Sequence, residues 1–205
     1  MKIGIIGPAQ SGKTTIFKVL LQSANITGGI GMLKFMDQRI EKLSEIFSSK
    51  KKVYPETAFL DISLNSGFTG KEYSKLHDID LFICVANAFF NEDPKKYLES
   101  YITDLILSDL EAIQTRLARI EKERLKMKTD AEGETRLLKK CQEALENSKL
   151  LRNIALAKDE LKLFSGFSFI TLRPIIVVIN LEEGKPEDMV KSAEDYCSAM
   201  GMRHI

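Results

Sequence analysis

The sequence predicts an α/β fold with a mainly parallel sheet, into which an antiparallel helical coiled-coil arm is inserted. Three observations favour this fold. Short apolar runs rich in β-branched residues alternate with segments of helical periodicity, as in a parallel sheet covered by helices. A glycine-rich turn directly follows the first apolar run. A charge-dense middle segment, residues 94–162, almost lacks proline and glycine, which is typical of long helices.

The expected elements follow the chain in a simple order. Buried strands are expected at residues 2–6, 57–62, 80–86 and 174–179, each short and apolar. Helices are expected at residues 13–23, 37–47 and 185–201, where apolar side chains recur at helical spacing. Residues 25–31 are glycine-rich and are expected to be mobile, and residues 65–77 are expected to form a loop with a short helix.

The composition excludes several classes of protein. With 205 residues, 44% hydrophobic content and a net charge of +1, the chain can bury one core and is not built mainly to coat nucleic acid, so no sequence-specific DNA binding is expected. Cys84, Cys141 and Cys197 lack metal-ligand spacing and are expected to be reduced thiols of a cytoplasmic protein. We expect no signal peptide and no membrane span, because no apolar run approaches about 18 residues.

The turn after the first strand reads GPAQSGKTT, residues 7–15, and matches the full G-x-x-x-x-G-K-[ST] pattern of a phosphate-binding loop. The glycines let backbone N–H groups face an anion, and the following helix N-terminus adds partial positive charge. Lys13 is expected to reach the β and γ phosphates and Thr14 to bind Mg²⁺. The alternative is a chance Gly-Lys-Thr turn, against which the flanking strand and helix argue.

Two further strand ends carry polar residues suited to a nucleotide. Asp61 ends the TAFLDI run, where P-loop proteins place a carboxylate that holds Mg²⁺ through water; a capping aspartate is the alternative. The segment Asn180-Leu181-Glu182-Glu183 follows PIIVVI, where guanine-selective proteins carry N-K-x-D. Leu181 replaces that lysine and Glu183 that aspartate, so selectivity for guanine should weaken. A surface loop is the alternative for this segment.

The charge-dense middle segment has a heptad seam. Its positions step by four and three: Ile106, Leu110, Ile113, Leu117, Ile120, Arg124 and Met127. The polar run TDAEGE contains a glycine and predicts a turn, after which Leu138, Cys141 and Leu145 share one helix face. We therefore expect a helical hairpin that buries little of itself. Both a solvated structural arm and a partner-binding arm remain open.

These motifs together resemble the Obg-like ATPase family, a branch of the P-loop translation-factor GTPases with a Ras-like G domain. The stretches that carry the resemblance are DQRIEKLSEIFSSKKKVYPETAFLDI, TDLILSDLEAIQTRLARIEK and LRPIIVVINLEE, in family order. The resemblance implies a nucleotide-binding domain at residues 1–93 and 163–205, with residues 94–162 as the inserted arm. It also implies a preference for ATP over GTP, slow hydrolysis, and association with the ribosome or translation machinery.

The resemblance also implies roles for single residues. The residues expected to wrap the phosphates are Gln10, Ser11, Gly12, Lys13, Thr14 and Thr15. The base is expected to lie beside Asn180, Leu181 and Glu183, and Mg²⁺ beside Thr14, with Asp61 acting through water. The family's switch threonine is out of register here, and Thr27 is the nearest candidate for a further Mg²⁺ ligand.

The chain departs from the family in the switch regions. Leu64 stands where the family's D-x-x-G motif has the glycine that senses the γ-phosphate. No glutamine that could position the attacking water lies between Asp61 and Gly70, but the family also lacks one there, so its absence does not exclude hydrolysis. His77 is a weak candidate for that role, because a lone histidine is more often a surface residue. The chain stops at residues 201–205, where the family's last strand and base loop would begin, so the nucleotide domain is expected to be truncated at its C-terminal end. The family's C-terminal β domain has no counterpart either.

Three hypotheses for function follow. The first is a slow Mg²⁺-dependent ATPase or GTPase that regulates translation, with a catalytic residue still unknown. The second is a nucleotide-binding scaffold whose switches do not cycle and whose arm docks a protein or RNA partner. The third is a helical adaptor with a vestigial nucleotide fold. Lys13, Thr14 and Asp61 favour the first hypothesis, and Leu64 favours the second.

Overall fold

The structure is a computed structural model. It describes residues 1–21, 26–62, 76, 78–89, 93–127, 132–167, 169–182 and 190–205. Several sequence predictions therefore lie outside the described residues: the loop with a short helix expected at residues 65–77, with Leu64 and His77, and the base-binding role of Glu183.

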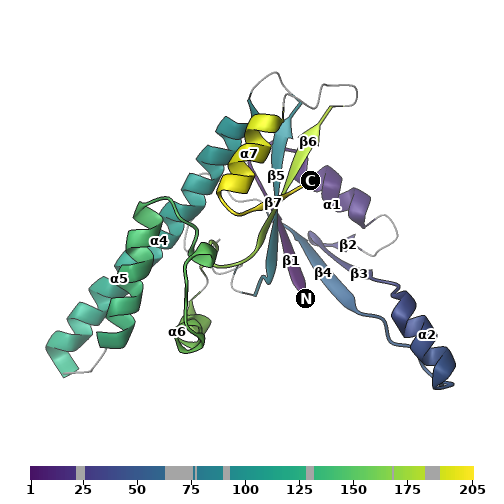
Figure 1. The fold of residues 1–205 in the computed structure, drawn as a ribbon, viewed down its shortest axis with the longest axis horizontal. Coiled ribbons are helices and arrows are strands. Elements are labelled where there is room, and N and C mark those ends of the chain that lie inside the picture. Colours follow the sequence, from purple (N-terminus) through teal and green to yellow (C-terminus); the bar gives the residue numbers. More distant parts are fainter. Residues whose placement is uncertain are drawn as a thin grey trace.

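A mainly parallel sheet forms the centre of the molecule, as the sequence predicts (Figure 1). The strand order in the described part of the chain is β2-β3-β4-β1-β5-β6-β7. The parallel strands are β1 (Lys2–Ile6), β4 (Glu56–Asp61), β5 (Leu81–Ala88), β6 (Ile175–Leu181) and β7 (Arg203–His204). The four strands expected from apolar runs are confirmed, with ends that shift by one or two residues.

A β-hairpin lies in the glycine-rich segment that the sequence predicts to be mobile. Strands β2 (Ile26–Thr27) and β3 (Ile30–Lys34) pair antiparallel, and β3 pairs antiparallel with β4. The turn between them is Gly28-Gly29, with φ of 59° and 78°. Two consecutive residues at positive φ match the twist of a tight hairpin, and glycine adopts them without steric cost. The sequence did not predict this hairpin, and the expected mobility of the segment stays a prediction.

Helices cover both faces of the sheet because successive strand residues point to opposite sides. On one face, α1 (Lys13–Leu20) packs Phe17 against Ile5 and Val85. On the other face, α4 (Pro94–Met127) and α7 (Lys191–Ala199) bury apolar side chains against β5 and β6. The expected helices at 13–23 and 185–201 are confirmed over these described ranges.

Helix α2 (Gln38–Ile46) extends away from the sheet (Figure 1). Asp37 is its N-cap, and the carboxylate accepts a hydrogen bond from the Arg39 N–H at 2.9 Å. Its apolar residues Leu43, Ile46 and the adjoining Phe47 are exposed. The helix expected at residues 37–47 is thus confirmed, but its apolar stripe does not face the core.

The charge-dense segment forms a long helical hairpin from α4 and α5 (Glu132–Glu146) (Figure 1). The buried seam residues include Ile106, Ile113 and Ile120, and they meet Leu137, Leu138, Cys141 and Leu145 of α5. Arg124 is exposed, so the seam prediction is wrong at that position. None of the helices in the described part of the chain has the length and apolar character of a membrane span.

The base of the arm belongs to the core of the sheet. Leu98, Ile102 and Leu105 of α4 are fully or almost fully buried in the same apolar cluster as Phe82 and Val177 of the strands. The arm thus buries more of itself than its charged sequence suggests. After α5 the chain returns to β6 through η1 (Leu151–Asn153), α6 (Lys158–Leu163) and η2 (Phe164–Gly166). The division into residues 1–93 with 163–205 and residues 94–162 stays a prediction.

Candidate nucleotide site

The predicted phosphate loop connects β1 to α1 at the carboxyl edge of the sheet. Because parallel strands end at the same edge, the polar residues that follow them converge there. Asp61 ends β4, Asn87 lies near the end of β5, and Asn180 lies near the end of β6. Each contributes a hydrogen bond to the loop or to the helix that follows it.

Two glycines of the loop occupy positions that exclude a side chain. Gly12 caps α1 with φ of 92°, and a Cβ there would lie 2.3 Å from Nδ2 of Asn180. Gly7 has φ of 146°, and a Cβ would lie 2.5 Å from the carbonyl oxygen of Val85. Both contacts are shorter than van der Waals packing permits, and both backbones favour glycine. The backbone of the loop therefore lies in close contact with β5 and β6.

Lys13 folds back over the loop. Its Nζ donates hydrogen bonds to the carbonyl oxygens of Gly7, at 2.9 Å, and Pro8, at 2.6 Å. Burial lowers the pKa of the Lys13 amine, and the nearby Asp61 carboxylate opposes that shift. An ammonium has three donors, so these two contacts leave one for a phosphate oxygen. The loop thus holds a cation where the β and γ phosphates are expected.

Thr14 and Asp61 lie in direct contact, although 47 positions separate them in the sequence. The Thr14 hydroxyl donates to Oδ2 of Asp61 at 2.7 Å. Oδ1 of Asp61 and Oγ of Ser11 are buried and have no hydrogen-bond partner among the described residues. Buried polar atoms without partners are rare in proteins. A hydroxyl and a carboxylate are hard oxygen ligands, so this pair fits Mg²⁺.

Asn180 supports the loop from the opposite side. Its side-chain amide donates to the carbonyl oxygen of Ser11 at 3.0 Å. Leu181, the last residue of β6, is half-buried. Its predicted contact with a base stays a prediction.

The fold also gives the positions of three further predicted ligands. Gln10 is exposed in the loop with φ of 61°, and Thr15 is exposed on α1. Thr27 lies exposed on β2, where it pairs with Ile30 of β3. Their roles as ligands stay predictions.

Two contacts to the loop were missed by the sequence reasoning. Asn87 donates from Nδ2 to the carbonyl oxygen of Gln10 at 3.5 Å. The hydroxyl of Tyr101 accepts a hydrogen bond from the Gly7 N–H at 3.1 Å. Asn87 could have been found from its place near the end of a buried strand, in the NAFF run. No sequence signal points to Tyr101, since it lies on a helix far along the chain.

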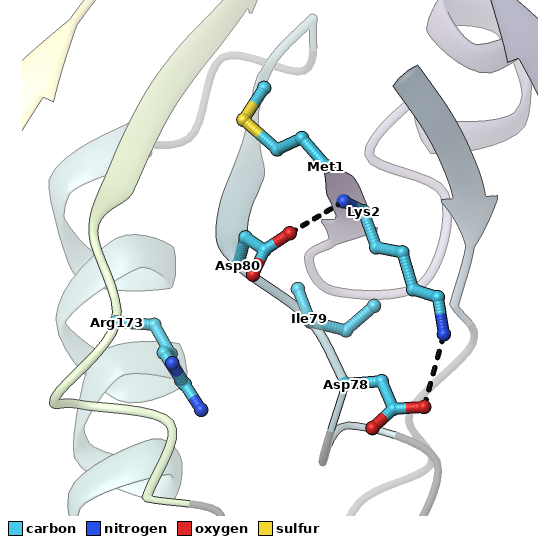
Figure 2. A pocket seen from close by; sticks show the side chains of 6 residues that line it. All are labelled: Met1, Lys2, Asp78, Ile79, Asp80 and Arg173. Atoms are coloured by element: carbon cyan, nitrogen blue, oxygen red, sulfur yellow. Dashed lines mark hydrogen bonds and ion pairs between the residues drawn. The ribbon is translucent and has the colours of Figure 1, made fainter. Parts of the chain in front are cut away.

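A depression lies at the edge of the sheet opposite the phosphate loop (Figure 2). It has a volume of about 500 Å³ and is lined by Met1, Lys2, Asp78, Ile79, Asp80 and Arg173. The Lys2 backbone N–H donates to Asp80 at 2.8 Å, and its Nζ pairs with Asp78 at 3.0 Å (Figure 2). This edge holds the starts of the parallel strands, whereas nucleotides bind at their carboxyl ends. It is therefore separate from the candidate nucleotide site.

Comparison with known proteins shows which P-loop proteins the chain resembles. No family model matches the chain. The ribosome-binding ATPase YchF of Bacillus subtilis is 30% identical over 210 residues, which cover 90% of this chain and 57% of that protein. The chain is a relative of the Obg-like ATPases. The YchF of Haemophilus ducreyi is 29% identical over 212 residues, covering 91% of this chain and 58% of that protein.

Solved structures give the same result for the fold. The YchF GTPase of Schizosaccharomyces pombe superposes with a TM-score of 0.82, covering 100% of this chain and 64% of that chain at 20% identity. The predicted P-loop fold with its long inserted helix is therefore confirmed. The chain spans somewhat more than half the length of the curated Obg-like relatives that it matches.

Proposed function

We propose that the chain is the nucleotide-binding part of a Mg²⁺-dependent regulatory NTPase that works with the ribosome in the cytoplasm. The observation that carries the proposal is the convergence of Lys13, Thr14 and Asp61 around the loop, beside buried oxygen atoms without partners. The relatives are ribosome-binding ATPases, which supports the ribosome as partner.

Different residues of the site bind different parts of a nucleoside triphosphate. The loop N–H groups and the start of α1 bind phosphate oxygens, and the Lys13 ammonium neutralises their charge. Mg²⁺, when bound, supplies further neutralisation of the phosphates. Thr14 and Asp61 are the residues that would hold Mg²⁺, the hydroxyl as a ligand and the carboxylate through water. Gln10, Ser11, Gly12 and Thr15 complete the wrap around the phosphates.

The base is held near Asn180, Leu181 and Glu183, and adenine binds at least as well as guanine. Leu181 offers no ammonium to the base, and a glutamate in place of aspartate sets its oxygens further out. A guanine preference above about 100-fold, or about 2.7 kcal/mol, would contradict this part of the proposal.

The test is a calorimetric titration of the wild-type chain with ATP and GTP, with and without Mg²⁺. Lys13→Ala is expected to weaken binding roughly tenfold to 100-fold, because a charge-assisted hydrogen bond is worth about 1.5–3 kcal/mol. Lys18→Ala is the matched control, since Lys18 is an exposed lysine on the same helix. Equal affinities for wild type and Lys13→Ala would refute the proposed site.

Asp61→Asn separates the cation site from the phosphate site. The amide keeps the shape of the side chain and its acceptor for Thr14, but it removes the charge. We expect nucleotide affinity without Mg²⁺ to change little, and the gain in affinity on adding Mg²⁺ to shrink. A full Mg²⁺ effect in the variant would place the cation elsewhere.

Two further assays test turnover and partner. Phosphate release that depends on Lys13 supports a slow NTPase, whereas tight binding without release supports the scaffold that does not cycle. Co-sedimentation of the chain with ribosomes, with and without ATP, tests the partner. A chain that stays in the supernatant under both conditions would contradict ribosome binding through this part of the protein.

A further inference from the structure

Tyr101 joins the arm helix α4 to the phosphate loop. Its hydroxyl accepts a hydrogen bond from the N–H of Gly7, the first residue of the loop, at 3.1 Å. The Tyr101 side chain is 7% exposed, and Gly7 is buried. Burial raises the pKa of the Tyr101 hydroxyl far above its usual value, so the group stays neutral and keeps its acceptor. A buried N–H must retain a partner, so the start of the loop follows the position of this hydroxyl.

The same helix continues without interruption into the arm. No proline or glycine occurs between Lys95 and Met127, so α4 can act as one stiff rod. At 1.5 Å per residue, the far end of α4 lies about 40 Å from Tyr101 along the axis. A force on the arm therefore reaches Tyr101 as a tilt or shift of the helix base.

A second connection leads from α4 to the other side of the loop. Asp109 is fully buried, and its carboxylate accepts from the N–H of Ile170 at 3.0 Å, the N–H of Thr171 at 2.8 Å and the Thr171 hydroxyl at 2.6 Å. These residues lie a few positions before β6, near whose end Asn180 donates a hydrogen bond to the carbonyl oxygen of Ser11. Helix α4 thus holds Gly7 directly and Ser11 through β6.

We propose that Tyr101 is a positioning residue that couples the arm to the phosphate loop. A partner that shifts the arm changes the geometry of the first loop turn, and a bound nucleotide changes the arm in return, because coupling between two sites is reciprocal. In this proposal Tyr101 is not a ligand of the nucleotide and acts on the loop through its hydrogen bond with Gly7. The effect of the arm on nucleotide binding rests on the proposed function, but the hydrogen bond between Tyr101 and Gly7 can be tested without nucleotide.

The first test compares Tyr101→Phe with Tyr196→Phe. Both variants remove one hydroxyl, and Tyr196 is a half-buried tyrosine on α7, a helix that packs against α4. In nucleotide-free protein, Tyr101→Phe is expected to speed amide hydrogen exchange at Gly7 at least about fivefold, because the N–H loses its acceptor. Tyr196→Phe should leave that exchange rate unchanged. Equal Gly7 exchange in wild type and Tyr101→Phe would overturn the proposal.

The second test measures the coupling. In Tyr101→Phe we expect ATP and GTP to bind about three- to tenfold more weakly than in wild type, with Tyr196→Phe matching wild type. Adding nucleotide to wild type should change the exchange protection of the α4–α5 arm, and this change should shrink in Tyr101→Phe. An arm that does not respond in wild type, or that responds equally in the variant, would overturn coupling through Tyr101.

The two proposals fail in distinguishable ways. A wild-type chain that binds neither ATP nor GTP contradicts the proposed function, while the Gly7 exchange rates still decide whether Tyr101 positions the loop. A wild-type chain that binds nucleotide, with Tyr101→Phe equal to it in affinity, Gly7 exchange and arm response, contradicts the further inference alone.

Discussion

In the α4–α5 arm, large apolar side chains fill the space between two helices, whereas in the phosphate loop the contacts are made by backbone atoms and small polar groups. Ile113 and Leu138 are fully buried in the arm. In the loop, carbonyl oxygens of Gly7, Pro8 and Ser11 accept hydrogen bonds from side chains that come from elsewhere in the fold or reach back from α1.

This difference teaches where each region is vulnerable. The arm is held together by the packing of large side chains. Substitutions at its surface should therefore change its stability little, whereas shortening a buried side chain should destabilise it. The loop depends on backbone geometry and close approach, so even one added methyl group should disturb it. The substitutions that follow test this contrast, from the largest expected effect to the smallest.

Leu138→Ala should have the largest effect on stability. Leu138 is 0% exposed, and removing a fully buried leucine side chain costs about 2–5 kcal/mol of unfolding free energy. Leu107→Ala, at a position of α4 that is 55% exposed, should stay within about 0.5 kcal/mol of wild type. Urea unfolding followed by circular dichroism measures both. Similar losses for the two variants would mean that the arm is not held by its buried seam.

The same glycine-to-alanine change should have opposite effects in the two regions. At Gly12, an alanine needs the left-handed backbone, which costs about 1–2 kcal/mol, and its Cβ clashes with Asn180. At Gly133 on α5, the added Cβ meets no atom of the described residues within 4 Å, and alanine should stabilise the helix by about 0.5–1 kcal/mol.

Thermal unfolding and ATP titration of both variants measure the contrast. Gly12→Ala should lose stability and bind nucleotide at least about tenfold more weakly. Gly133→Ala should gain stability and bind as wild type does. If Gly12→Ala retained wild-type affinity, close approach of the loop to β6 would not matter for binding.

The smallest effect is expected at Asp37, the partly exposed N-cap of α2, which lies outside both the arm and the phosphate loop. The Arg39 side chain, followed by its backbone N–H, lowers the pKa of Asp37 from 3.8 to about 2. Because the folded pKa lies below the unfolded value, the capping contribution is complete above about pH 4 and is lost as the pH falls through about 2.

Amide chemical shifts of Arg39 and Ile40 between pH 5 and about 1.5 report this loss as fraying of the first turn of α2. Asp37→Asn keeps an acceptor for the N–H group but cannot titrate, so its shifts should stay flat over the same range. A flat profile in wild type would show that the Asp37 carboxylate does not support the helix.

The sequence alone determined the features that depend on local pattern. The P-loop motif, the apolar strands and the heptad spacing each lie within a short stretch, so composition and periodicity reveal them. The hairpin of β2 and β3 was missed because β2 is short and exposed, and because β3 pairs with β4, a partner distant in sequence. The Gly28-Gly29 pair was the signal that could have indicated it.

Only the tertiary structure decided how the loop is held. The bonds of Thr14 to Asp61, of Ser11 to Asn180 and of Gly7 to Tyr101 join residues separated by 47, 169 and 94 positions. Local sequence encodes which backbone conformations a segment can adopt. Which distant side chain reaches a given carbonyl or N–H depends instead on strand order and helix packing, which no short stretch of sequence contains.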